Sequence, residues 1–391
     1  MNIAFFCIPA HGHTNPTLAV VRELTARGHT VRYYTTEAFR AKVEAASAVF
    51  VPFDAEAARP GMTAADDARL GSDLAFSTKL IVDLTLAADD WLSRELTAHR
   101  PDVIVGDSMA FWAKLASKKH GIPFVSSTTT FAFNRFSAKV IGQNGAGFLQ
   151  FLLAQPRINR QLKRLRAAGY AVKSVFDIIA NDNETETVVY TSPDFQPCAD
   201  TFSEKYHFVG PLLRPAQSSF EKLPGRSLIY ISLGTVNNDA LPFYRACLAA
   251  FGGDPRFQLV LSAGTQTDLA ALGPIPESCT VRASVDQMAV LDCADVFLTH
   301  CGMNSASEGL WHGLPLVLYP QTPEQHGVAN RVAALGAGVP LTDPSADGIR
   351  RAVKTALTDP AYRENAQKLA GGFHRCGGAV EAADAIEHAA N

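Results

Sequence analysis

The chain has 391 residues, of which 47% are hydrophobic and 19% charged, and its formal net charge at pH 7 is -3. Such a composition excludes a disordered chain, and the length fits two globular domains of roughly 150–200 residues each. A charge so near balance argues against a general surface for nucleic acid or for an anionic membrane.

The N-terminal apolar run, residues 3–8, follows directly on Met1-Asn2 without a basic segment and ends at Pro9. It is too short for a signal peptide or a membrane span, so it predicts a first strand. Seven cysteines without a C-x-x-C pair or a repeated spacing indicate free, mostly buried thiols in a reducing compartment. We therefore expect a cytoplasmic protein without stable membrane insertion.

Short apolar runs alternate with helical patterns through the first half of the chain. The first helical pattern covers residues 16–27 and ends at Gly28. Continuous apolar strands separated by helices are typical of a parallel sheet covered on both faces. The predicted strands of this half are residues 3–8, 31–34, 49–51, 103–105, 124–125, 188–190 and 207–209.

Prolines, glycines and paired serines interrupt the pattern after residue 210, and the alternation then restarts. We predict an N-terminal domain at 1–213, a linker at 214–225 and a C-terminal domain at 226–391. The sequence leaves open whether the last helix, at 379–388, crosses back onto the first domain. The fold class is α/β, with two doubly wound Rossmann-like domains facing across a cleft. The predicted strands of the second domain are residues 228–233, 259–261, 280–282, 296–298 and 316–318.

A candidate acid–base pair follows from the topology of the first domain. The first predicted strand is followed by the sequence PAHGHTNP, which contains His11 and His13, and the fourth ends at Asp107. In a doubly wound sheet of order 3-2-1-4-5, strands one and four are neighbours at the switch point, where ligands bind. His13 and Asp107 would therefore meet as a general base and its orienting carboxylate. The alternatives are structural histidines and an aspartate that caps the following helix.

Aromatic and apolar side chains of the first domain hint at a small-molecule pocket, although most of them are expected to pack in the core. The candidate acceptor-binding residues are Phe76, Met109, Phe111 and Phe131.

The second domain contains a candidate phosphate site after the predicted strand 296–298. A turn with His300 and Gly302 leads into a helix that begins near Asn304 and Ser305. Helix N-termini present free N–H groups and a partial positive charge, which suit a phosphate. Glu308 lies one turn further and could accept hydrogen bonds from ribose hydroxyls. The alternative is an ordinary N-cap formed by Asn304 and Ser305.

Two further segments are candidates for donor contacts. Gly234 and Thr235 end the first strand of the second domain, where they form either a phosphate clamp or a plain loop. The sequence TPEQ, with Glu324 and Gln325, is a good helix start with a capping box. A cap at the edge of a cleft would point its side chains outward.

The motif HCGMNS with Glu308, the sequence GLP at 313–315, Pro320, Glu324 and Gln325 closely resembles the donor signature of glycosyltransferase family 1. That family has the GT-B fold, and the resemblance is greatest to bacterial macrolide and flavonoid glycosyltransferases over nearly the whole chain. It implies that His300, Asn304 and Ser305 hold the pyrophosphate and that Glu308 holds the ribose. It also implies that Glu324 and Gln325 bind the sugar, and it favours His13 over His11 as the base.

The chain departs from the family in the loop that contains Ser284, Val285 and Gln287. The family often has a tryptophan that stacks on the base, followed by a Pro-Gln pair. Alignment on Gln287 places Ser284 and Asp286 where the tryptophan and the proline would fall. The base must then stack on something else, such as Arg282 or the backbone.

These features predict an inverting, metal-independent hexosyltransferase. The donor would be a UDP-sugar, with glucose expected, acting as co-substrate and not as a cofactor. The acceptor would be a hydroxyl of a small lipophilic molecule such as a polyphenol or a macrolide. No D-x-D motif for a metal is present. The alternatives are a nucleotide-sugar epimerase or phosphorylase-like enzyme and a non-catalytic nucleotide-sugar-binding protein. No G-x-G-x-x-G follows any predicted strand, which argues against the interpretation as an NAD-binding oxidoreductase. The oligomeric state stays open.

Overall fold

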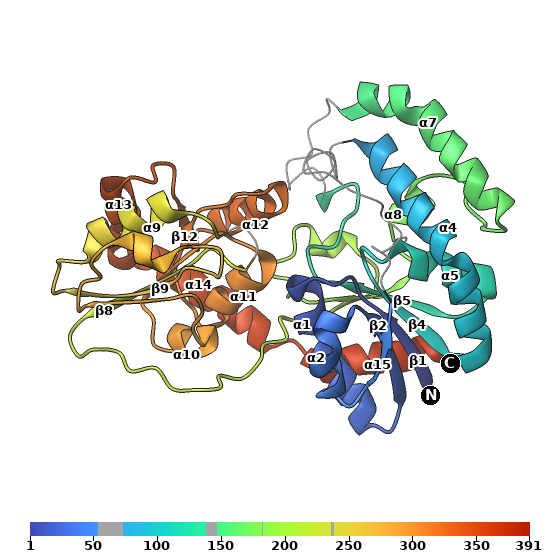
Figure 1. Ribbon diagram of the computed structural model, residues 1–391, viewed down its shortest axis with the longest axis horizontal. Helices are drawn as coiled ribbons and strands as arrows, with labels where there is room; N and C mark the ends of the chain where they lie inside the picture. Colours follow the sequence, from blue (N-terminus) through green and yellow to red (C-terminus); the bar gives the residue numbers. More distant parts are fainter. Residues whose placement is uncertain (54–72, 138–146, 182, 236–237) are drawn as a thin grey trace. The chain divides into compact units, whose positions relative to one another are not determined.

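The computed structural model describes residues 1–53, 73–137, 147–181, 183–235 and 238–391. The chain forms two compact units, which are traced in Figure 1. The first unit comprises Met1–Tyr190, Cys198–Leu212 and Gly377–Asn391, and the second comprises Thr191–Pro197 and Leu213–Cys376. Each unit has its own parallel sheet and its own hydrophobic core.

The first unit is built on a 7-stranded sheet of order β3-β2-β1-β4-β5-β6-β7, in which every pairing is parallel. Its strands are β1 (Asn2–Phe6), β2 (Thr30–Thr35), β3 (Val49–Pro52), β4 (Val103–Asp107), β5 (Phe124–Thr128), β6 (Glu186–Val189) and β7 (Tyr206–Phe208). Its helices are α1 (His11–Ala26), α2 (Arg40–Glu44), α4 (Leu74–His99), α5 (Phe111–His120), α7 (Gly147–Ala167), α8 (Phe176–Ile179) and α15 (Gly378–Ala390).

The position of β1 in this sheet creates the topological switch point. β1 pairs with β2 on one side and with β4 on the other, so that Phe6 lies opposite Gly106. Both strands are buried on both faces, as expected for continuous apolar strands in a parallel sheet. The carboxyl ends of β1 and β4 therefore lie side by side, and the segments that follow them meet there.

The last helix belongs to the first unit. α15, red in Figure 1, packs on α1 and against β4, β5, β6 and β7. Arg27 at the end of α1 forms ion pairs of 2.6 Å with Asp384 and 2.8 Å with Glu387. His29 Nε2 lies 2.6 Å from the same Glu387 carboxylate. The chain thus returns to its N-terminal half after completing the second unit.

The second unit repeats the architecture with a 6-stranded parallel sheet of order β10-β9-β8-β11-β12-β13. Its strands are β8 (Ser227–Ser232), β9 (Phe257–Ser262), β10 (Cys279–Arg282), β11 (Val296–Thr299), β12 (Leu316–Leu318) and β13 (Gly338–Pro340). Its helices are α9 (Leu241–Phe251), α10 (Gln287–Leu291), α11 (Met303–Trp311), α12 (Pro323–Ala334), α13 (Ala346–Thr358) and α14 (Pro360–His374). Here the switch point lies between β8 and β11, where Ser232 is opposite Thr299.

The unit boundaries differ from the sequence prediction in three respects. The segment 214–225 belongs to the second unit, and so does Thr191–Pro197, where Arg331 of α12 donates to the carbonyl of Phe195 at 2.8 Å. The second unit ends at Cys376, before the chain returns to the first unit. Contacts in space thus assign 214–225, which its proline and glycine content had suggested was a linker, to the second unit.

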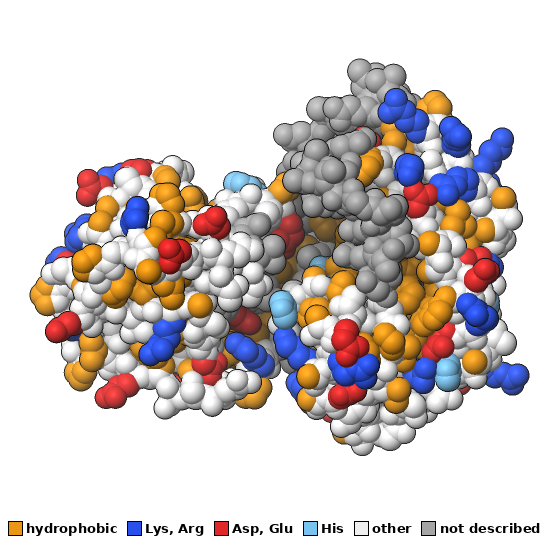
Figure 2. All heavy atoms as spheres, viewed as in Figure 1, with side chains coloured by type: hydrophobic (Ala, Val, Ile, Leu, Met, Phe, Trp, Pro, Cys, Tyr) orange, Lys and Arg blue, Asp and Glu red, His pale blue; other side chains and the backbone are white. Residues whose placement is uncertain are grey.

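The surface charges and the cysteines can be compared with the expectations from composition. On the face drawn in Figure 2, acidic and basic side chains are interspersed over most of each unit. Among the described residues, no helix is both long and apolar enough to cross a membrane. All seven cysteines are free thiols, and Cys7, Cys247, Cys279 and Cys301 are buried.

Candidate active site

The first turn of α1 carries His13. The sequence pattern had suggested a helix starting at Pro16, but α1 begins at His11 after the extended residue Ala10 and contains Pro16. Pro16 is the sixth residue of α1 and has no backbone N–H to donate to the carbonyl of Gly12, yet the helix continues through it. His13 is therefore held on a helix and not in the loop that precedes one.

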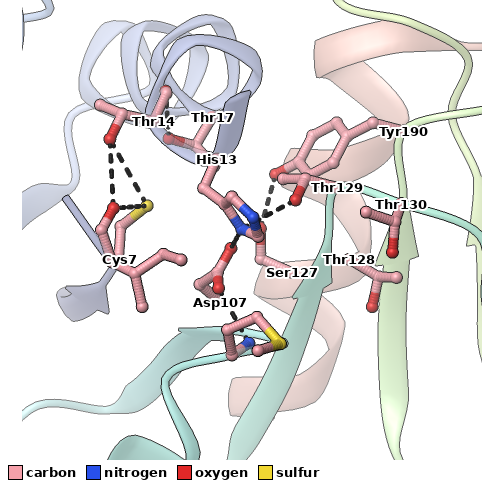
Figure 3. Close-up of polar contacts among 12 residues, drawn as sticks. Cys7, His13, Thr14, Thr17, Asp107, Ser127, Thr128, Thr129, Thr130 and Tyr190 are labelled. Carbon is pink, nitrogen blue, oxygen red and sulfur yellow. Dashed lines mark hydrogen bonds and ion pairs between the residues drawn. The ribbon is translucent and has the colours of Figure 1, made fainter. Parts of the chain in front are cut away.

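His13 and Asp107 lie in direct contact, as Figure 3 shows. Nδ1 of His13 is 2.7 Å from Oδ2 of Asp107, and the carboxylate side chain is fully buried while that of His13 is 19% exposed. The second carboxylate oxygen accepts the backbone N–H of Met109 at 2.8 Å. Asp107 does not cap the following helix, because α5 begins at Phe111 after Ala110. The buried carboxylate instead orients the imidazole.

Thr129, which the sequence analysis did not single out, completes this group. Its Oγ1 lies 3.0 Å from Nδ1 of His13, and the residue is 3% exposed. Figure 3 shows Thr129 just after the end of β5, on the other side of the imidazole from Cys7. The signal in the sequence was a run of threonines, 128–130, after the strand next to β4.

Buried polar side chains surround the His13–Asp107 pair. Ser127 and Tyr190 share a hydrogen bond of 2.9 Å, and Thr17 and Tyr33 share one of 2.7 Å. Cys7 is also buried, and burial, reinforced by the negative charge of Asp107, raises the pKa of its thiol above the usual range. The Cys7 thiol is therefore protonated at neutral pH and is a poor nucleophile. His11 is exposed and belongs to a different group, with its Nδ1 3.3 Å from Nζ of Lys42.

In the second unit, the ring of His300 lies between two glycines. A Cβ on Gly234 would come within 2.7 Å of its Cε1, and one on Gly302 within 2.6 Å of its Nε2. The φ of Gly234 is 81°, which favours glycine for a second reason. Burial lowers the pKa of His300 to about 4. The ring is therefore a neutral hydrogen-bond donor at physiological pH.

The helix after His300 begins with an uncapped N-terminus. α11 starts at Met303, its N-cap is Gly302, and no side chain caps it. Asn304 and Ser305 are thus the second and third residues of the helix, so the alternative in which they form the N-cap is wrong. Backbone N–H groups at such a helix start are suited to a phosphate. Thr235, the other candidate for a phosphate contact, follows β8 and is exposed.

Glu308 lies one turn along α11 in a chain of polar contacts. Tyr230 donates to Oε1 of Gln287 at 2.8 Å, and Nε2 of Gln287 donates to the carboxylate of Glu308. Burial raises the pKa of Glu308, whereas the hydrogen bond from Gln287 acts in the opposite direction. Gln287 thus holds Glu308 in a single orientation.

Comparisons with known proteins show which family the chain belongs to. The chain is 32% identical over 395 residues to NDP-glycosyltransferase YjiC of Bacillus licheniformis, covering 99% of this chain and 97% of that protein. It is 33% identical over 399 residues to demethyllactenocin mycarosyltransferase of Streptomyces fradiae, covering 99% and 86%. The family model for the C-terminal domain of erythromycin biosynthesis protein CIII-like proteins matches residues 257–376.

Solved structures agree. The glycotransferase of kitacinnamycin superposes with a TM-score of 0.85 at 30% identity, covering 99% of this chain and 98% of that one. The calicheamicin glycosyltransferase superposes with a TM-score of 0.82, also at 30% identity, covering 99% and 97%. The chain is a glycosyltransferase of the GT-B fold. The family and the α/β fold class predicted from the sequence are both confirmed.

The loop that departs from the family has a structural role in this glycosyltransferase. Ser284 is exposed and Val285 partly buried. Asp286 accepts the backbone N–H groups of Gln217 at 2.6 Å and of Ser218 at 2.8 Å through one carboxylate oxygen. Burial opposes ionisation of Asp286, but these hydrogen bonds keep its pKa below the usual value. The aspartate therefore fastens the segment around residue 217 to the loop.

The start of α12 differs from the expectation for Glu324 and Gln325. Thr322 caps the helix, and Oε1 of Gln325 accepts the backbone N–H groups of Gln321 at 2.8 Å and Thr322 at 3.2 Å. Gln325 is therefore buried and turned back on the cap, and only Glu324 is exposed. The expectation that both side chains point outward is wrong, because the capping box uses the carbonyl oxygen of Gln325.

The candidate acceptor residues of the glycosyltransferase have different surroundings. Phe131 is 3% exposed and packs as a core residue, whereas Met109 is 49% exposed. Phe76 and Phe111 are partly buried. Met109 is connected directly to the acid–base pair, because its backbone N–H donates to Asp107. In the described part of the chain, no group of three or more His, Cys, Asp or Glu residues could hold a metal ion.

Proposed function

We propose that this glycosyltransferase moves a hexose, preferably glucose, from a UDP-sugar to a hydroxyl of a small lipophilic acceptor with inversion at the anomeric carbon. The observation that carries the proposal is the 2.7 Å contact between Nδ1 of His13 and the buried carboxylate of Asp107. A hydroxyl is a weak nucleophile, and it needs a positioned base with a pKa near neutral.

The contact determines the tautomer of His13. With Nδ1 donating its proton to Asp107, the basic lone pair of the neutral imidazole is on Nε2. Nε2 then takes the proton of the acceptor hydroxyl as the oxygen attacks the anomeric carbon and the bond to the diphosphate breaks. Asp107 stabilises the imidazolium that results. One displacement of this kind inverts the anomeric configuration.

The leaving diphosphate would be bound in the second unit. The neutral His300 ring and the backbone N–H groups at the start of α11 donate to its oxygens, and Glu308 accepts from the ribose. These donors are already in place, and they stabilise the developing charge without a metal. We therefore propose a metal-independent transfer.

The names of relatives support the choice of substrates. Two relatives are named demethyllactenocin mycarosyltransferase and oleandomycin glycosyltransferase, the second from Streptomyces antibioticus. A third, YojK of Bacillus subtilis, is named as an uncharacterized UDP-glucosyltransferase and is 30% identical. An acceptor of the natural-product type and UDP-glucose as donor are consistent with these names.

Product analysis tests the proposal. The purified protein is incubated with UDP-glucose, TDP-glucose or UDP-galactose, with and without a panel of polyphenols and macrolides, and the products are separated by mass spectrometry. Transfer predicts a hexosylated acceptor that forms only when donor and acceptor are both present. Conversion of the donor without acceptor would indicate an epimerase, and tight donor binding with no product from the panel would favour a binding protein.

A further inference from the structure

The donor site has a nucleobase end that the sequence left unassigned. If the diphosphate lies at His300 and the ribose at Glu308, the base must lie on the far side of Glu308. The contacts lead from Glu308 to Gln287, and from the adjacent Asp286 to the backbone at residues 217 and 218. The base end is therefore bordered by the loop 282–287 and by the segment 213–218.

Arg214 in that segment acts on this region. Burial raises the pKa of Glu308, and the hydrogen bond from Gln287 and the positive charge of Arg214 both counteract the increase. The same charge helps to keep the pKa of Asp286 low, and it opposes the increase that burial causes in the pKa of Tyr230. The hydrogen bonds agree with these directions, because the backbone N–H groups of Gln217 and Ser218, three and four residues after Arg214, bind the Asp286 carboxylate at 2.6 Å and 2.8 Å.

The guanidinium is available to a ligand. Arg214 is exposed, and it makes no hydrogen bond or ion pair with any residue that the structure describes. The three hydrogen bonds that Asp286 accepts from Gln217 and Ser218 hold the backbone of this segment beside Ser284. The two departures thus lie in one loop: Ser284 is exposed, and Asp286, two residues on, holds the segment that carries Arg214.

We propose that Arg214 binds the nucleobase of the donor, with its planar guanidinium lying against the face of the base. This inference rests on the proposed function, since it assumes a nucleotide donor at Glu308 and His300. A guanidinium is flat, always charged and weakly hydrated, and it stacks on aromatic faces in a way that an ammonium does not. Stacking of this kind tolerates different bases, so uridine and thymidine donors should both bind.

Isothermal titration with UDP tests the assignment. Arg214→Ala should weaken UDP binding about tenfold, the lower part of the range for loss of a stacked base. Arg214→Lys should weaken it nearly as much, because it keeps the charge and loses the plane. Arg282→Ala tests the competing assignment, in which Arg282 contacts the base, and its UDP affinity should stay within about twofold of the wild type. Thermal melting checks that all variants fold alike.

Inorganic pyrophosphate, measured by competition against UDP, separates the base from the phosphates. Its affinity should be equal in wild type and Arg214→Ala. An equal loss for pyrophosphate and UDP would make Arg214 a phosphate contact and overturn the proposal. Unchanged UDP affinity in Arg214→Ala, full affinity in Arg214→Lys, or a loss found in Arg282→Ala instead would also overturn it. Wild-type protein that binds UDP no better than pyrophosphate would overturn the nucleotide donor itself.

Discussion

Nδ1 of His13 lies 2.7 Å from Oδ2 of Asp107, although the two residues are 94 positions apart in the chain. The contact exists because β1 and β4 are neighbours in the sheet, so that the start of α1 and the end of β4 meet. The contact orients the imidazole, and the consequences of this orientation can be measured.

Asp107→Asn should reduce turnover by on the order of 10²-fold or more, because the amide no longer fixes the tautomer or stabilises the imidazolium. Thr129→Val is the matched comparison at the same nitrogen. It removes a neutral hydrogen bond worth about 0.5–1.5 kcal/mol and should cost no more than roughly tenfold. Steady-state kcat for acceptor glycosylation measures both. A larger loss in Thr129→Val than in Asp107→Asn would show that the hydroxyl, and not the carboxylate, orients the base.

The low pKa of His300, about 4 against an ordinary 6.5, predicts a dependence of stability on pH. The unfolded chain takes up a proton on this side chain below pH 6.5, whereas the folded protein does not until about pH 4. The fold therefore loses stability as pH falls from 6.5 towards 4, by roughly 2–3 kcal/mol for this group. His300→Gln removes this contribution.

Denaturant unfolding of wild type and His300→Gln at pH 7.5 and pH 4.5 measures the effect. The variant should gain stability relative to wild type at the lower pH, so that its free energy of unfolding minus that of wild type becomes more positive. A difference that stays constant between the two values would mean that His300 titrates normally in the folded protein.

Activity should survive chelation, because the groups proposed to receive the leaving diphosphate are protein donors. The assay is run in excess EDTA and then with Mg²⁺ or Mn²⁺ restored. A rise greater than about tenfold on addition of metal, equivalent to roughly 1.4 kcal/mol of barrier, would contradict the metal-free mechanism.

Ser284→Trp should tighten UDP binding, because an indole beside the donor loop would add a stacking surface. In the wild type, UDP and TDP should bind within about an order of magnitude of each other. Titration of UDP, TDP, ADP and GDP against both proteins gives the selectivity. Strict uridine selectivity in the wild type would indicate that a side chain reads the edge of the base by hydrogen bonds.

Much of the fold follows from the sequence, since each apolar run of the first half became a strand of the predicted parallel order. β13 was missed because it is only Gly338–Pro340, too short and too poor in apolar residues for a pattern. The start of α1 was placed five residues late, because Pro16 is normally a sign of a helix beginning and not of one in progress.

The site residues were predictable where the strand order or a motif determined their positions, and not where side-chain packing determined them. The strand order places the turn with His11 and His13 beside Asp107, and the resemblance to the family selects His13. Thr129 reaches Nδ1 only through the exact path of the chain after β5, which no spacing reveals. The capping box at Gln325 was predicted from the sequence and is present, but the expectation that its side chain also points outward is wrong. Arg214 lies in a segment that the sequence predicted to be a linker.

The kcat of His13→Ala tests the central claim most directly, with UDP affinity measured on the same preparation. Removal of the base should lower transfer by on the order of 10²-fold or more and leave the Kd for UDP nearly unchanged, because His13 acts on the acceptor hydroxyl. His11→Ala, with an exposed ring paired to Lys42, is the control and should keep most of the turnover. Wild-type turnover in His13→Ala, together with a large loss in His11→Ala, would show that the wrong histidine has been assigned as the base.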